Sequence, residues 1–187
     1  MSQENAEIVR QPLTVAPSSR RRLEERAGLR FPGIRALLLQ SAWRLPLRSR
    51  LRQALLRRVV QAGLEAVNRA DFEVAFAVYD SEVKLISDPR LTALGFERMY
   101  RGREERIRFQ ERWTAEWGDF QFAPDELVDL GDGRLFASGR IVGSGLSSGA
   151  GFDGDWACLW TISAGRVVRE QFFFDRADAL EAVGLRE

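Results

Sequence analysis

Apolar residues in roughly the first two thirds of the chain recur at the three-to-four-residue spacing of amphipathic helices. Proline interrupts this spacing at residues 32 and 46, and Ser49 and Asp71 stand where a helix cap is needed. Each segment between these breaks presents one apolar face, so we expect it to bury that face. The predicted helices are 20–29, 33–44, 48–70, 72–80 and 103–117.

From residue 119 onward the period changes to two, which is typical of strands with one buried face. Glycine-containing turns at 131–133 and 164–165 separate the alternating runs and indicate an antiparallel meander. An earlier alternating run ends at Pro89, because proline cannot donate to a strand ladder. The predicted strands are 82–87, 119–130, 134–144, 152–162 and 166–175, and a last helix is predicted at 177–183.

This order of elements describes an α+β domain in which a strongly bent antiparallel sheet wraps three helices into a cone. Residues 55–187 are predicted to form this domain, and residues 19–54 to form a helical arm rich in Arg and Leu. Residues 1–18 are polar, contain proline and lack periodicity, so we expect a disordered tail.

Composition removes several classes of chemistry. The chain has no histidine, which excludes Ser-His-Asp and Cys-His pairs and imidazole metal ligands. The single cysteine, Cys158, excludes an internal disulfide and a cysteine-based zinc cluster. No metal and no cofactor are therefore expected, and any acid-base chemistry would fall to carboxylates, Arg, Tyr or water.

The net charge of +1 hides two oppositely charged parts. Residues 1–58 carry 13 Arg against 4 Glu, whereas residues 59–187 carry 15 basic against 23 acidic side chains. We expect the basic arm to dock on its own domain or on a partner copy, in preference to nucleic acid or an anionic membrane surface. The apolar run at 36–39 is too short to span a bilayer, so a cytoplasmic location is expected.

Strand alternation suggests which side chains line the inside of the cone. Trp156, Cys158 and Trp160 share one face of their strand, and Glu170 shares a face with Phe172 and Phe174 in the next. If these faces point inward, Glu170 is a carboxylate in an aromatic cavity and a candidate general acid or base. The alternative is that Glu170 pairs with an arginine across the sheet.

Short motifs inside the predicted domain carry a family resemblance. They are Asn68 with Asp71, Tyr100 to Glu104 opening the third domain helix, Trp160 before the hairpin Gly165 to Val168, and Asp175-x-x-x-Ala-Leu. With them, residues 55–187 resemble the SnoaL-like (polyketide cyclase-like) branch of the nuclear-transport-factor-2-like superfamily. The resemblance implies the cone fold and a homodimer. It leaves function open, because the superfamily includes cyclases, isomerases, hydrolases, dehydratases and members that only bind a ligand or partner.

The same resemblance permits a comparison with the ketosteroid isomerases of the superfamily, whose base carboxylate would correspond to Ser87 or Asp88. Their oxyanion-hole tyrosine corresponds to Gly63, and their protonated aspartate falls near Ala157 or Cys158. Only Asp88 remains, so steroid isomerase chemistry by that route is not expected. Many relatives carry histidine at the place of Cys158, which we expect to act as a small buried hydrophobe.

The sequence therefore predicts a SnoaL-like protein that binds a small apolar molecule, with acid-base chemistry by Asp88 or Glu170 as an open extension. The predicted ligand-binding residues are Tyr79, Phe109, Trp113, Arg140, Trp156, Cys158, Trp160, Phe172 and Phe174. The alternative is a non-catalytic assembly module whose cone is filled by its own aromatics. An internal cavity would favour binding, and carboxylates bound to arginine or outside the cavity would argue against catalysis.

Overall fold

A computed structural model of the chain describes residues 8–15, 20–30, 32–115, 117, 119–146 and 149–184. The helices are α1 (Leu23–Arg30), α2 (Pro32–Trp43), α3 (Arg50–Asn68), α4 (Phe72–Ala75), α5 (Arg103–Ala115) and α6 (Arg176–Val183), with a 3-10 helix at Pro89–Leu94. The strands are β1 (Val9–Pro12), β2 (Tyr79–Ile86), β3 (Met99–Arg101), β4 (Gln121–Asp129), β5 (Arg134–Ser144), β6 (Gly151–Ser163) and β7 (Arg166–Phe173). Within these residues, no helix is long and apolar enough to cross a membrane.

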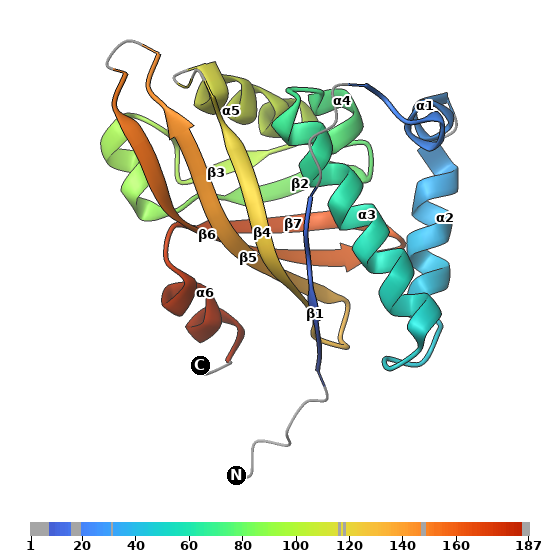
Figure 1. The fold of residues 1–187 in the computed structure, drawn as a ribbon. Helices are drawn as coiled ribbons and strands as arrows, with labels where there is room; N and C mark the ends of the chain where they lie inside the picture. Colours follow the sequence, from blue (N-terminus) through green and yellow to red (C-terminus); the bar gives the residue numbers. More distant parts are fainter. Residues whose placement is uncertain are drawn as a thin grey trace.

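The strands form one sheet in the order β1-β4-β5-β6-β7-β2-β3, and this sheet bends around the helices (Figure 1). The main core lies between the sheet and α2, α3, α4 and α5, and a second apolar cluster lies under α6 on the opposite face. The predicted α+β class and the meander β4-β5-β6-β7 are confirmed. One pairing differs from the prediction: β2 lies parallel to β7, so the sheet is mixed.

A bulge in β4 lies opposite Gly139, where the strand register shifts between Pro124 and Glu126. A Cβ atom at Gly139 would lie 2.6 Å from the Pro124 Cα, closer than real side chains come. The two backbones can approach at this point only because position 139 carries no side chain. This contact is one source of the bend that closes the cone.

Two parts of the chain differ from the sequence prediction. Val9–Pro12, inside the predicted disordered tail, form strand β1 on the edge of β4, and Leu13 beside it is fully buried. Helix α4 ends at Ala75 instead of continuing to residue 80, because Tyr79 already pairs with Val167 of β7. These features depend on partners far away in the sequence. Residues 1–7 and 16–19 of the predicted tail lie outside the described residues.

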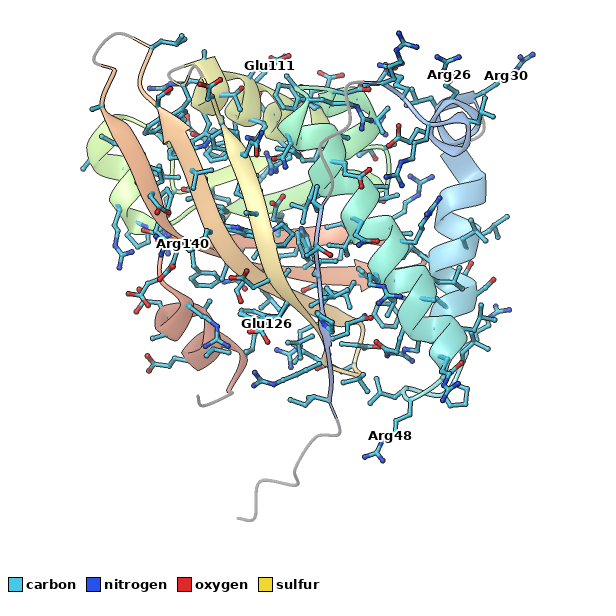
Figure 2. All side chains as sticks on the ribbon, viewed as in Figure 1. Arg26, Arg30, Arg48, Glu111, Glu126 and Arg140 are labelled. Carbon is cyan, nitrogen blue, oxygen red and sulfur yellow. The ribbon has the colours of Figure 1, made fainter. Side chains whose placement is uncertain are left out.

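The arm packs beside α3, with Arg26 and Arg30 near one end and Arg48 near the other (Figure 2). Its first segment makes ion pairs with the cone: Arg21 donates to Asp71 at 2.6 Å, and Arg22 to Glu65 at 2.8 Å. In the reverse direction, Arg69 of the cone donates to the buried Glu25 at 2.9 Å. Charges of opposite sign therefore meet along this junction.

Asp71 links arm docking to pH. Burial raises the pKa of Asp71, but hydrogen bonding and attraction from Arg21 outweigh it, so the pKa lies below its ordinary value. Because the pKa is lowered in the folded state, charged Asp71 stabilises docking at pH values above the ordinary carboxyl pKa. This stabilisation is lost as the pH falls through the lowered pKa of the folded state. We expect the protection of the α1 amides against hydrogen exchange, relative to the intrinsic rate at each pH, to fall below about pH 4.

Asp71→Asn is expected to raise exchange in α1 already at neutral pH and to remove most of this acid dependence, as measured by exchange mass spectrometry. The matched control is Glu73→Gln, since the Glu73 side chain is 70% exposed while also contacting Arg21. Equal acid dependence in Asp71→Asn and the unaltered chain would contradict this assignment.

Candidate functional site

An apolar cavity lies inside the cone, between the concave side of the sheet and helices α2, α3 and α5. The centres of water molecules can occupy a volume of about 80 Å³ in this cavity. This is space for several waters or a small organic group. Of the residues proposed from sequence, those that line the cavity are Tyr79, Phe109, Trp113, Trp156, Cys158, Trp160, Glu170 and Phe172.

Strand register explains how the polar and aromatic side chains converge. Cys158 pairs with Phe172 across β6 and β7, and Trp160 pairs with Glu170, so side chains on one face stand next to one another. On α5, the positions Arg106, Phe109, Gln110 and Trp113 follow helical spacing and all four line the cavity.

A buried ion pair between Arg106 and Glu170 forms the polar wall of the cavity. The Arg106 Nε donates to Glu170 Oε2 at 2.6 Å, and Nη2 donates to Oε1 at 3.0 Å. Both side chains are less than a tenth exposed, and the guanidinium also lies over the Phe76 ring. Burial lowers the pKa of Arg106, but the charge and hydrogen bonds of Glu170 outweigh it, so the pKa is raised and Arg106 stays charged.

Two further polar groups beside this pair are held neutral. Burial, followed by the negative charge of Glu170, raises the pKa of the Cys158 thiol well above its ordinary value. The same two causes raise the pKa of Tyr79, whose hydroxyl oxygen accepts a hydrogen bond from Trp160 Nε1 at 2.9 Å. Neither group is therefore a thiolate or phenolate nucleophile at neutral pH.

Asp88 does not face the cavity. It is 2% exposed, and its carboxylate oxygens accept the backbone N–H groups of Arg90 at 2.8 Å and Phe174 at 3.0 Å. It caps the 3-10 helix and ties the end of β7 to the loop after β2. The geometry therefore gives Asp88 a structural role and corrects its placement as a cavity base.

Two predicted ligand-binding residues also lie away from the cavity lining. Arg140 is exposed and pairs with Asp153 at 2.6 Å and Asp155 at 2.7 Å, because it shares the outer face of β5 with Phe136. Phe174 packs behind the lining, with its ring centre 5.5 Å from that of Trp113. These placements correct the predictions for both residues.

Sequence reasoning missed several lining residues. Arg106 and Gln110 lie three residues before Phe109 and Trp113, so helical spacing alone places them on the same face as the aromatic stripe. Leu39 from the arm had no such signal, because its position depends on how α2 packs against the cone. In the part of the chain that the structure describes, no group of three or more Asp, Glu or Cys side chains could hold a metal.

Two donors on α5 remain unused. Gln110 Nε2 and Trp113 Nε1 are buried and have no hydrogen-bond partner among the described residues. Buried polar groups are almost always paired, so each unpaired donor requires an explanation.

Comparison with known proteins identifies the family of this domain. The family of SnoaL-like domains matches residues 60–170, more than half of the chain. The chain belongs to the SnoaL-like family. Among curated proteins, none matches this SnoaL-like protein.

Solved structures share this fold. A protein of unknown function from Burkholderia pseudomallei, described as NTF2-like, is 22% identical and covers 66% of this chain and 93% of its own, with a TM-score of 0.58. TerC, co-crystallised with polyporic acid, is 20% identical, with coverage of 68% and 96% and a TM-score of 0.57. A putative SnoaL-like polyketide cyclase from Jannaschia sp. is 16% identical, with coverage of 70% and 92% and a TM-score of 0.54. At these identities the likeness establishes the fold.

Proposed function

We propose that this SnoaL-like protein binds a small, largely apolar molecule in the cone cavity. The observation that carries the proposal is the cavity itself, whose wall is apolar and aromatic except around Arg106 and Glu170. Such a wall with a few placed polar groups is the usual composition of a small-molecule site. The volume of about 80 Å³ favours a ligand of about one ring over a large polycyclic one. TerC, which shares the fold, was crystallised with an organic acid, and this agrees with ligand binding.

The proposal is binding, without proton transfer by the two candidate carboxylates. Both oxygens of Glu170 are engaged by Arg106, and the oxygens of Asp88 accept backbone N–H groups away from the cavity. A general base needs a carboxylate within reach of the substrate and free to take its proton. The arrangement therefore favours a ligand-binding protein of this fold over an acid-base enzyme that uses Asp88 or Glu170.

Thermal unfolding with small apolar probes tests the proposal. Benzene, ethylbenzene and cyclohexane are expected to stabilise the protein, because a ligand at ten times its Kd adds about 1.4 kcal/mol to a folded state that alone binds it. Isothermal titration calorimetry should give one site per chain. Absence of any shift with all three probes up to their solubility limits would contradict the proposal.

Gly63 allows the cavity to be closed by a single substitution. It lies inside α3, and a Cβ there would meet only ordinary contacts, the nearest being the Ala75 carbonyl oxygen at 3.8 Å. Gly63→Ala is expected to stabilise the protein by about 0.5–1 kcal/mol, because alanine favours helix, and to keep probe binding. Gly63→Leu is expected to fill the cavity and weaken ethylbenzene binding at least tenfold in calorimetry. Unchanged binding in Gly63→Leu would place the ligand elsewhere.

A further inference from the structure

We propose that the ligand carries an uncharged hydrogen-bond acceptor, such as a ketone oxygen, which Gln110 Nε2 and Trp113 Nε1 hold in the cavity. This inference rests on the proposed function, because it names the chemistry of a ligand in that same cavity. Both residues line the cavity, both are less than a tenth exposed, and both have an unpaired N–H group. In an otherwise apolar site, two such donors select for an acceptor atom.

The orientation of the Gln110 amide follows from its neighbour. Arg106 Nη1 donates to Gln110 Oε1 at 3.1 Å, and a guanidinium can only donate hydrogen bonds. The amide must therefore present its oxygen to Arg106, which leaves the Nε2 hydrogens for another partner. Because Arg106 is in turn held by Glu170, the ion pair positions the Gln110 amide as a donor.

Trp113 differs from the other tryptophans that line the cavity. Trp156 Nε1 donates to the Arg140 carbonyl oxygen at 3.0 Å, and Trp160 Nε1 donates to the Tyr79 hydroxyl at 2.9 Å. Trp113 Nε1 has no partner among the described residues, although the residue is only 6% exposed. Trp113 and Gln110 lie three residues apart on α5, a spacing that brings side chains together on one helix face.

The charges of the site favour a neutral acceptor over a carboxylate. The positive charge of Arg106 is already matched by Glu170 through two hydrogen bonds. A second carboxylate would enter an apolar cavity without a countercharge of its own and close to the charge of Glu170, which is costly. A ketone or ether oxygen accepts from N–H donors without adding charge.

Two probes of similar size separate this inference from general apolar binding. Acetophenone carries a carbonyl oxygen, whereas ethylbenzene has hydrogen atoms there. Calorimetry on the full chain is expected to give about fivefold or greater preference for acetophenone, the value of one net hydrogen bond. The infrared carbonyl band of bound acetophenone should lie at lower wavenumber than that of acetophenone in hexane.

Variants assign the preference to the two donors. Trp113→Phe and Gln110→Leu are each expected to lower the ratio of acetophenone affinity to ethylbenzene affinity several-fold, and to move the carbonyl band of bound acetophenone toward its position in hexane. Trp117→Phe is the matched control, because Trp117 Nε1 is also buried without a partner among the described residues but Trp117 does not line the cavity, so it should not change the preference. If Gln110→Leu fails to fold, Trp113→Phe and the infrared band of bound acetophenone still test the inference.

The outcomes separate failure of the inference alone from failure of both proposals. Equal binding of both probes, or a preference that survives both variants, overturns the inference and leaves apolar binding intact. Tighter binding of benzoate than of acetophenone overturns the assignment of a neutral acceptor. Failure of every probe to bind overturns the proposed function together with the inference.

Discussion

Replacing Arg106 by methionine is expected to reduce the free energy of unfolding by about 3–5 kcal/mol at neutral pH. The substitution removes one partner of a buried pair and leaves the Glu170 carboxylate without its countercharge in an apolar cavity. Desolvation of an unpaired charge is far more costly than the packing change from Arg to Met. Urea unfolding followed by tryptophan fluorescence measures the loss.

Two controls isolate the ion pair. Arg108→Met on the same helix removes an arginine whose side chain is 64% exposed, and it should change stability by less than about 0.5 kcal/mol. The double variant Arg106→Met/Glu170→Leu should regain most of the loss, because no buried charge remains. A double variant that is as unstable as Arg106→Met would show that packing, and not the unpaired charge, dominates.

Gly165→Ala is expected to destabilise the protein by about 2–4 kcal/mol and to release the arm from the cone. Gly165 lies in the β6–β7 turn at φ +75°, and a Cβ there would lie 2.8 Å from the Ala36 carbonyl carbon and 3.1 Å from the Gln40 N of α2. Backbone atoms cannot give way as a flexible side chain can, so α2 must move. Hydrogen exchange in α2 should rise sharply.

Gly184→Ala supplies a matched control for backbone strain. Gly184 has φ +72°, but a Cβ there meets no atom within 4 Å. This variant should lose only about 1 kcal/mol and leave exchange in α2 unchanged. Because Leu39 of α2 lines the cavity, Gly165→Ala should also weaken ethylbenzene binding, whereas Gly184→Ala should not. Equal effects of the two substitutions would remove the evidence for this contact.

These two predictions concern different parts of one site. Arg106 and Glu170 set its polar wall and orient Gln110, whereas the turn at Gly165 holds α2 against the cone. The arm therefore contributes to the cavity itself, through Leu39, besides neutralising charge on the cone surface.

Hydrophobic periodicity was sufficient to predict a helix or strand where turn or cap residues marked its ends and its apolar face is buried in the structure. Helix α3 with its Ser49 cap, the meander from β4 to β7 and the C-terminal helix follow from spacing and turns along the chain. Alternation in β6 likewise placed Trp156, Cys158 and Trp160 on the cavity face. Local patterns failed for β1, because a four-residue strand forms only against a distant partner.

The sequence by itself determined the fold class, which aromatic side chains share a strand face and the absence of histidine chemistry, because these depend on residue identity and spacing along the chain. Only the tertiary structure decided the role of each polar group. Glu170 could have been a base or half of an ion pair, and the approach of Arg106 from α5, 64 positions away, made it the latter. Side chains compete for partners in three dimensions, and the nearest countercharge decides the outcome.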